Sequence, residues 1–293
     1  MALYAFDGTW NVDEIDDEKD TNVCRFLAAY DEPGVENKYL QGVGTKLGWL
    51  GKLAGGITGA GGWGRVLEAR EHLEEHWRGE DLVVIGFSRG AALALDFVNE
   101  ISDGVRPRQA AANGTSPTVV PNVLFLGLWD LVASFGVPGN QINLGFQLTV
   151  PPTVRHCFHA MALDERRYSF GLTRVKYRED RSRPDGAKRA HEVWFRGGHG
   201  DVGGGNLNAA RSDIALRWMM MRALALGVRV QPSLVPPPLP PEEDPPVRVK
   251  DWLIPRRRKP GTHERVHHTV ERSLGKGHND PPPPFLIEED SEV

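Results

Sequence analysis

Residues 82–95 hold the pattern that most limits how this chain can fold. Residues 82–85 are a continuous apolar run, residues 86–90 read Gly-Phe-Ser-Arg-Gly, and residues 91–95 are alanine and leucine. The apolar run predicts a buried strand, and the small residues after the turn predict a helix. Glycines on both sides of Ser88 leave room for a tight turn, from which the serine hydroxyl projects at the carboxyl end of the strand. The helix N-terminus would favour negative charge that develops beside Ser88.

Strands and helices are expected to alternate along the rest of the chain. Short apolar runs predict strands, and apolar residues at helical spacing predict helices, the first capped by Asp20 or Thr21. Expected strands span residues 3–6, 38–40, 82–85, 123–128 and 193–195, and expected helices span 21–30, 66–77, 91–95 and 209–226. This order predicts an α/β fold, α/β-hydrolase-like, with a mostly parallel central sheet and helices on both faces.

The length of 293 residues suits one large domain. We expect residues 1–293 to form a single α/β-hydrolase domain, with a glycine-rich loop at 42–64 and a proline-rich segment at 231–246 as embellishments. Residues 59–64 match Gly-x-Gly-x-x-Gly, but no strand precedes them as a dinucleotide site requires. A mobile loop over the site is therefore the better interpretation of this stretch.

Three residues in the order serine, acid and histidine each follow an expected strand. They are Ser88, Asp130 and His199. A neutral serine is a weak nucleophile, so a histidine must take its proton, and a buried carboxylate must orient that histidine. The sequence therefore predicts a Ser-His-Asp triad that works through an acyl-enzyme. Asp201 is the rival for the acid, and the histidines inside apolar segments, His156, His159 and His191, are expected to pack or lie at the surface.

Backbone N–H groups near Ser88 are expected to stabilise the oxyanion of the reaction. The N–H of Arg89 follows the serine directly, and a second donor should come from the loop after the first strand, at Gly8 or Thr9. Asp7 is expected to hold that loop by hydrogen bonds. Asp201 is given the same supporting role beside His199.

Six ordered blocks resemble one known family. They are residues 7–11 (Asp-Gly-Thr-Trp-Asn), 86–91 (Gly-Phe-Ser-Arg-Gly-Ala), 127–130 (Gly-Leu-Trp-Asp), 162–167 (Ala-Leu-Asp-Glu-Arg-Arg), 199–205 (His-Gly-Asp-Val-Gly-Gly-Gly) and 212–219 (Ser-Asp-Ile-Ala-Leu-Arg-Trp-Met). Together they resemble the α/β-hydrolase family that includes the type VI secretion phospholipase effectors, over about residues 3–275.

This resemblance implies that Ser88, Asp130 and His199 match the family's triad. It implies a serine esterase or lipase that cleaves carboxylic esters, often the acyl esters of phospholipids in lipid degradation, without a cofactor. The chain departs from the effectors in two ways: nothing in it resembles their membrane-association domain, and Gly200 stands where a larger polar residue is expected. The expected partner is an ester or lipid substrate, with peripheral membrane contact left open because of the first departure, and protein partners stay unassigned.

Two alternatives compete with the serine hydrolase. Residues 263–267 read His-Glu-Arg-Val-His, the HExxH pattern of a zinc-protease helix, with Glu288 or Glu289 as a third ligand. A surface helix with incidental histidines is the interpretation we favour, so no metal site is expected. The other alternative is a non-catalytic binding protein that keeps the fold.

Composition excludes several further classes. The net charge of −4 argues against a nucleic-acid surface. Cys24 and Cys157 form no CxxC pair, and residues 1–7 are too short for a secretory signal. We therefore expect a cytoplasmic protein as synthesised, with signal-independent export left open.

The basic run 256–259 is expected to be solvated, with contact to anionic lipid headgroups as the alternative.

Two segments that follow strands carry many apolar side chains. Residues 42–64 and 131–152 combine glycine or proline with apolar groups that include Trp49, Leu50, Ile57 and Trp63, and Val132, Phe135, Ile142, Leu144 and Phe146. Soluble proteins rarely leave so much apolar surface exposed without a use. An acyl pocket with its cover is predicted here, and ordinary packing on the core is the alternative.

Overall fold

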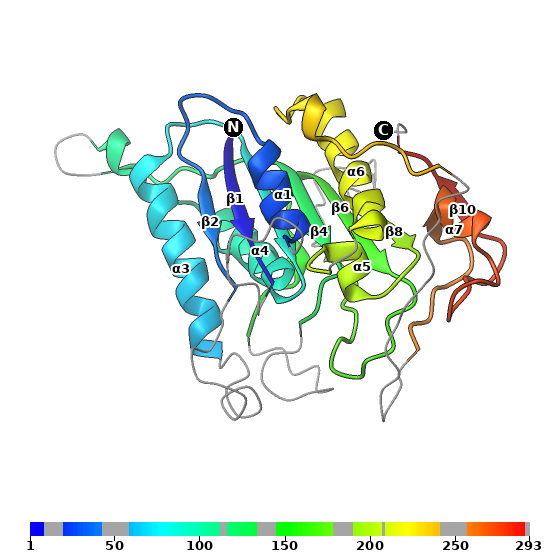
Figure 1. Cartoon of the computed structure of the whole chain (residues 1–293). Helices are drawn as coiled ribbons and strands as arrows, with labels where there is room; N and C mark the ends of the chain where they lie inside the picture. Colours follow the sequence, from blue (N-terminus) through cyan, green and yellow to red (C-terminus); the bar gives the residue numbers. More distant parts are fainter. Residues whose placement is uncertain are drawn as a thin grey trace, which may run out of the picture.

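A central parallel sheet organises the molecule (Figure 1). The structure is a computed structural model that describes residues 1–8, 20–42, 59–111, 116–133, 145–177, 190–206, 209–240 and 257–290. Within them, eight strands lie in the order β10-β9-β8-β6-β4-β3-β1-β2, and every neighbouring pair is parallel. The strands are β1 (Ala2–Phe6), β2 (Lys38–Leu40), β3 (Leu82–Phe87), β4 (Val123–Trp129), β6 (Val154–Ala162), β8 (Ala190–Phe195), β9 (Arg265–His267) and β10 (Leu286–Glu288). A separate small sheet pairs β5 (Thr149–Val150) with β7 (Lys176–Tyr177).

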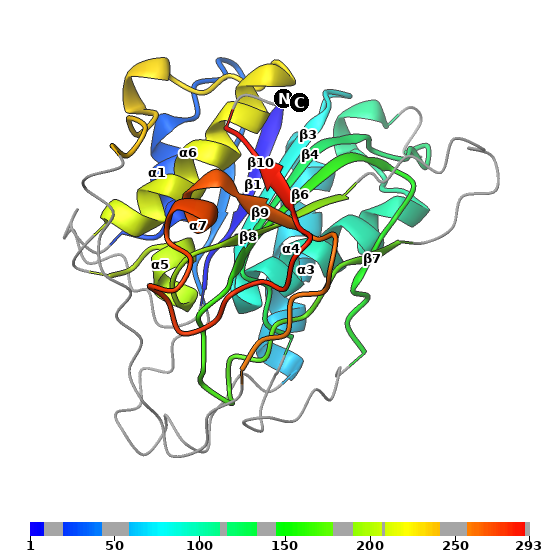
Figure 2. The same cartoon turned by 90° about the vertical axis from the view of Figure 1, so that its right-hand side faces the viewer.

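Helices cover both faces of the sheet (Figure 2). One face carries α1 (Asn22–Ala29) and α6 (Ala210–Ala225), and the other carries α3 (Gly59–His76) and α4 (Arg89–Glu100). The short elements are α5 (His199–Gly203), α7 (His268–Arg272), and the 3₁₀ turns η2 (Ile101–Asp103), η3 (Arg108–Ala110) and η4 (Pro232–Leu234). The predicted α/β class with a mostly parallel sheet is therefore confirmed. No helix among the described residues is long and apolar enough to cross a bilayer.

Strand alternation divides the core between the two faces. On β1, Tyr4 and Phe6 pack with α3 and α4, whereas Leu3 and Ala5 pack with α1 and α6. Strands buried on both faces read as continuous apolar runs, which is why β1, β3 and β4 were predictable. Helix α1 begins as expected, because the Thr21 side chain accepts a hydrogen bond from the Cys24 N–H and caps the helix.

The strand β6 was not among the expected elements. Polar side chains at Arg155, His156 and His159 interrupt its apolar pattern. The structure buries His159 completely and pairs both of its ring nitrogens, Nδ1 with Glu192 at 3.0 Å and Nε2 with the Leu131 N–H at 3.1 Å. A buried histidine with two partners is compatible with a central strand, but its partners lie on other strands and loops.

Residues 59–64 form the start of α3, so the loop expected there was wrong for these positions. A Cβ atom at Gly62 would lie 3.0 Å from Phe146 and 3.1 Å from Leu93. The missing side chain thus lets the helix approach α4 closely. The remainder of the glycine-rich stretch, residues 43–58, lies outside the described residues. Of the proline-rich segment, residues 231–240 are described and contain the single turn η4, while residues 241–246 are not described.

The helix expected over the HExxH pattern is also wrong. Residues 265–267 are strand β9, which pairs with β8 and buries Val266 beside Trp194. His263 has a left-handed backbone with φ of 63°, and Glu264 accepts hydrogen bonds from Arg174 and the Trp194 indole. The two histidines therefore do not share a helix face, and the motif has no zinc-protease geometry.

Candidate active site

Ser88 stands in a strained turn between β3 and α4. Its φ of 59° and ψ of −123° lie in a region that side chains other than glycine rarely adopt. The neighbouring glycines make this turn fit. A Cβ at Gly86 would lie 2.7 Å from the Ala91 Cα, and a Cβ at Gly90 would lie 2.3 Å from the carbonyl oxygen of Phe6. The local sequence thus folds into the turn because no side chain occupies either position.

Ser88, His199 and Asp130 form one hydrogen-bonded row. His199 Nε2 lies 2.8 Å from Ser88 Oγ, and His199 Nδ1 lies 2.6 Å from Asp130 Oδ2. The three residues follow β3, β8 and β4, whose carboxyl ends meet at one edge of the sheet. All three are buried, with exposed fractions of 5%, 6% and 0% in the order Ser88, His199 and Asp130. The structure therefore brings together the three residues singled out in the sequence.

The electrostatics of the row suit proton transfer. Burial lowers the pKa of His199 below its usual value, and the hydrogen bond to Asp130, which raises it, offsets this only in part. Burial by itself raises the pKa of Asp130, but the charge of Arg258 and the contact with His199 outweigh burial and hold that pKa below its usual range. His199 is therefore neutral near pH 7. Its Nδ1–H donates to the ionised Asp130, and its Nε2 accepts from the Ser88 hydroxyl.

Arg258 is a site residue that the sequence reasoning missed. Its guanidinium donates through NH1 and NH2 to the two carboxylate oxygens of Asp130, the NH2 bond being 2.9 Å long. It also donates to the carbonyl oxygens of Ala162 at 2.7 Å and Phe170 at 3.0 Å. The expectation of a solvated basic run was wrong for Arg258, which is only 8% exposed. No pattern in the neighbouring sequence distinguishes Arg258 from the other basic residues of the run. The only indication in the sequence is that a buried Asp130 needs a positively charged partner.

Glu165 supports His199 from the other side. Its Oε2 accepts the backbone N–H of His199 at 3.0 Å, and its carboxylate receives two hydrogen bonds from the Arg167 guanidinium. Burial raises the pKa of Glu165, but the Arg167 contacts outweigh it and bring the value to about 2. An ionised Glu165 thus fixes the backbone at which α5 begins.

The expected oxyanion donors are placed unequally. Arg89 is the first residue of α4, where a backbone N–H has no acceptor within the helix. The Gly8 N–H donates to Asp7 Oδ1 at 2.6 Å, so in this structure it is already engaged. Thr9 lies outside the described residues. The assignment of Gly8 and Thr9 to an oxyanion hole therefore stays a prediction.

Asp7 and Asp201 both accept hydrogen bonds at the ends of strands and loops near the row, and their supporting roles stay predictions. Asp7 is buried, and its Oδ2 accepts from Thr21, Tyr39 and Cys24, which ties the end of β1 to α1 and β2. Burial raises the pKa of Asp7 above its usual value. Asp201 accepts from the Gly198 N–H at 2.8 Å and from Asn206 at 2.9 Å. The acid that contacts the His199 ring is thus Asp130, not Asp201.

The predicted acyl pocket is only partly described. Phe146 and Val132 are 2% and 3% exposed and are core residues, so the alternative of ordinary packing holds for them. Trp63 is 46% exposed on α3, with its ring centroid 5.9 Å from that of Phe146. The other side chains named for this pocket, Trp49, Leu50, Ile57, Phe135, Ile142 and Leu144, lie outside the described residues.

One group of side chains among the described residues is close enough to hold a metal ion. Its members are His267, His268 and Asp290, whose ligand atoms lie within 4.8 Å of one another. Protein partners already engage each of them. Asp290 is bound by Arg217 and His267, and His268 contacts Glu289. These hydrogen bonds explain the cluster without a metal ion, because they hold the chain that follows β10 against β9, α6 and α7.

Comparisons with known proteins agree with this architecture. Residues 3–101 and 98–222 match the family model described as "T6SS, Phospholipase effector Tle1-like, catalytic domain". No curated protein matched the chain. A crystal structure of an uncharacterized protein from Pseudomonas aeruginosa is 21% identical, with a TM-score of 0.58 over 80% of this chain and 47% of that one.

A second solved structure, the Tle1 effector bound to the VgrG spike from the type 6 secretion system, is 22% identical. Its TM-score is 0.46, over 70% of this chain and 50% of that one. The chain thus spans about half the length of each of these two solved structures. Arg258 lies beyond residue 222, where the family match ends.

Proposed function

This chain belongs to the family of Tle1-like phospholipase effector catalytic domains of type VI secretion, and on that premise we propose that it hydrolyses carboxylic esters of lipids. The proposed substrates are phospholipids, cleaved at an acyl ester. Ser88 is the nucleophile, His199 the general base and Asp130 the acid of the triad.

The observation that carries the proposal is the hydrogen-bonded row on the strained turn. Two contacts support the proposal: His199 Nε2 lies 2.8 Å from Ser88 Oγ, close enough to take its proton, and His199 Nδ1 lies 2.6 Å from Asp130, close enough for Asp130 to orient the ring. An ordinary core serine would not need a left-handed backbone between two glycines. Strain of this kind collects at active sites, where it fixes the direction of a reacting group.

The acylation step follows from this geometry. Ser88 Oγ attacks the carbonyl carbon of the ester while its proton passes to His199 Nε2. The tetrahedral oxyanion is stabilised by the Arg89 N–H and the N-terminus of α4. Asp130 stabilises the imidazolium that forms. The C–O bond to the alcohol then breaks, and the alcohol leaves with the proton from His199.

Deacylation repeats the same steps with water. His199 Nε2 takes a proton from water as its oxygen attacks the acyl-enzyme carbonyl, and then returns the proton to Ser88 Oγ. The products are a carboxylic acid and the regenerated serine. Arg258 touches no reacting atom in this scheme. It is a positioning residue that holds Asp130 ionised and correctly oriented.

A fluorophosphonate probe tests the proposal directly. The probe should form a covalent adduct with the wild-type protein, located at Ser88 by peptide mass spectrometry. The adduct should be lost in His199→Ala, because Ser88 then has no base. Hydrolysis of phosphatidylglycerol vesicles, measured as free fatty acid, should be lost in the same variant and insensitive to a metal chelator. Absence of the adduct in a folded wild-type protein would support the non-catalytic alternative.

A further inference from the structure

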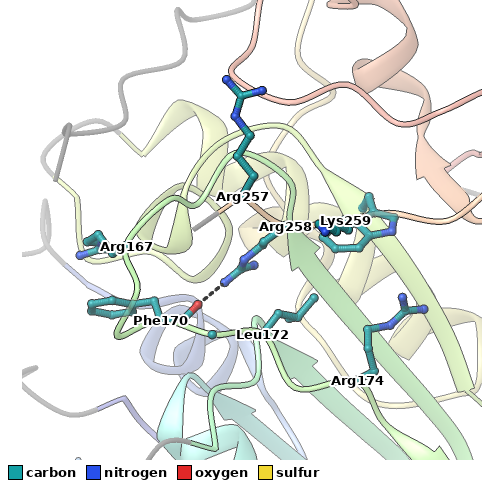
Figure 3. Close-up of a pocket in the computed structure, with 9 residues that line it drawn as sticks. Arg167, Phe170, Leu172, Arg174, Arg257, Arg258 and Lys259 are labelled. Carbon is teal, nitrogen blue, oxygen red and sulfur yellow. Dashed lines mark hydrogen bonds between the residues drawn. The ribbon is translucent and has the colours of Figure 1, made fainter. Parts of the chain in front are cut away.

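A cavity of about 560 Å³ lies beside the triad (Figure 3). That volume is within the range of small-molecule sites. Among the residues that the structure describes, its lining contains no acidic residue and five cationic ones: Arg167, Arg174, Arg257, Arg258 and Lys259. The lining also contains three large apolar side chains: Phe170, Leu172 and Trp194. The cavity is therefore both positively charged and apolar.

Two lining residues also contact the triad. The Phe170 ring meets the His199 ring edge to face, with centroids 4.7 Å apart. Arg258 lines the cavity and binds both carboxylate oxygens of Asp130. In Figure 3 the Arg258 guanidinium points toward the carbonyl oxygen of Phe170, so these two residues form one wall. A molecule held in the cavity thus touches side chains that touch the reacting groups.

Among the described residues, the charged groups around the cavity carry one more positive than negative charge. Glu165 pairs with Arg167, Asp130 with Arg258, and both Glu192 and Glu264 with Arg174. These four carboxylates do not line the cavity, whereas the five cations do. Within the described part of the chain, no anionic partner is found for Arg257 or Lys259. The positive ends of the pairs therefore face the cavity, with a net charge that a single anion balances.

We propose that this cavity binds the phosphodiester headgroup of the lipid whose ester is cleaved at Ser88. A phosphodiester carries one negative charge, and Arg257 and Lys259 supply charge-assisted hydrogen bonds to its oxygens. The half-buried Phe170 and Leu172 contact the carbon atoms on either side of the phosphate. This inference rests on the proposed function, because the headgroup site has meaning for catalysis only if an acyl ester reaches Ser88.

Binding is tested without turnover, in the full chain with Ser88→Ala. The probes are glycerophosphoglycerol, which is the deacylated headgroup, and inorganic phosphate, each titrated by NMR. The double variant Arg257→Gln/Lys259→Gln should bind glycerophosphoglycerol about tenfold more weakly, which corresponds to about 1.4 kcal/mol. The matched control Arg272→Gln/Lys276→Gln changes the net charge equally at exposed residues away from the cavity, and should bind as the parent does.

Kinetics with active enzyme form a second arm. For dihexanoylphosphatidylglycerol, KM should rise about tenfold in the double variant, in keeping with the same two lost contacts. Hydrolysis of the neutral p-nitrophenyl hexanoate should not change. Equal effects on both substrates would overturn the headgroup assignment. If wild type hydrolyses neither ester, the proposed function fails, and the NMR arm still decides whether the cavity binds a phosphodiester.

Three outcomes of the binding arm overturn the proposal. Glycerophosphoglycerol that does not bind excludes a headgroup site. Equal affinities in the double variant and its matched control place any binding elsewhere on the surface. Inorganic phosphate that binds more tightly than the diester indicates a site for free phosphate, since a phosphate with more negative charge would then be preferred.

Discussion

At the scale of single residues, Ser88 carries the proposed chemistry and little of the packing. Ser88→Ala removes one oxygen from a side chain whose partner is His199. We expect kcat for ester hydrolysis to fall by roughly 10⁴–10⁶-fold, as for loss of a triad nucleophile. The melting temperature should change little. The measurement is a p-nitrophenyl butyrate assay beside a thermal melt.

Ser233→Ala is the matched control, because Ser233 is exposed on the turn η4, which carries none of the site residues. It should retain full activity. If a folded Ser88→Ala protein keeps more than about a tenth of the wild-type rate, the loss is far smaller than removal of a triad nucleophile causes. The nucleophile would then be another residue.

Arg258 allows a test of positioning that a merely structural residue would not pass. The kcat/KM of the wild type should fall only below pH 6.5, because burial lowers the pKa of His199 from 6.5 and the neutral imidazole is the active form. Arg258→Gln removes a positive charge beside Asp130, which favours the imidazolium and so raises the pKa of His199. The acid limb of the pH–rate profile should move to higher pH.

The rate at the plateau should fall too, but by less than the roughly 10⁴-fold cost of replacing the triad acid by its amide. Arg258→Lys should recover part of the rate, because it keeps the charge but not the two-pronged contact. Arg272→Gln, at an exposed position, serves as the control on p-nitrophenyl butyrate. If Arg258→Gln lowers the rate but the acid limb of the pH–rate profile does not move, Arg258 stabilises the fold and does not affect the pKa of His199.

At the scale of elements, α4 carries a buried carboxylate that stands outside the proposed mechanism. Asp96 is 8% exposed and accepts the Gln147 N–H at 2.8 Å. Burial raises the pKa of Asp96 to about 6 from an ordinary value of 3.8, so the folded state disfavours the ionised form. Stability is therefore lost as pH rises from 3.8 to about 6 and does not return above it.

Asp96→Asn keeps an acceptor for the Gln147 N–H and has no charge to bury. Its melting temperature should exceed that of wild type at pH 8 and match it near pH 4. Asp31→Asn, at an exposed aspartate, should show no such pH dependence. An Asp96→Asn protein that is less stable than wild type at pH 8 would show that the charge itself is needed.

The elements also show what sequence could and could not predict. Strands β1, β3 and β4 are apolar on both faces, so their runs were visible, and Ser88 and Asp130 come directly after two of them. His199 follows β8, of which only the apolar end Val193-Trp194-Phe195 was visible in the sequence. β6 was missed because His159 is polar in sequence yet satisfied across strands by Glu192. β9 was missed because its residues Arg265-Val266-His267 hold a single apolar side chain and fall inside the HExxH pattern, which was interpreted as a helix. Arg258 was missed because its partner lies 128 positions earlier.

At the scale of the whole molecule, paired carboxylates connect the sheet to the loops around the site. Glu192 on β8 binds His159 of β6 and Arg174, and Glu165 binds Arg167 and the His199 backbone. Burial raises the pKa of Glu192, but its contacts with His159 and Arg174 outweigh this and bring the value to about 2. The pKa of Glu165 is also about 2, against 4.5 for an ordinary glutamate.

Because both folded pKa values are depressed, the stabilisation is complete above pH 4.5 and is lost as pH falls toward 2. We expect the urea midpoint to drop steeply over that interval. Glu192→Gln should lower the midpoint at pH 7 and flatten the acid slope, whereas Glu71→Gln, at an exposed glutamate, should leave both unchanged. A wild-type midpoint that stays constant from pH 5 to pH 3 would contradict this account.

The place of Arg258 in the chain has a consequence for how the protein is made. During translation Ser88, Asp130 and His199 are synthesised well before Arg258, which follows Asp130 by 128 positions. Until then the Asp130 carboxylate, fully buried in the finished fold, has no guanidinium to offset its desolvation. The nascent chain therefore carries an unfinished site. The site is completed when the C-terminal segment, which contains Arg258, β9 and β10, docks at the edge of the sheet beside β8.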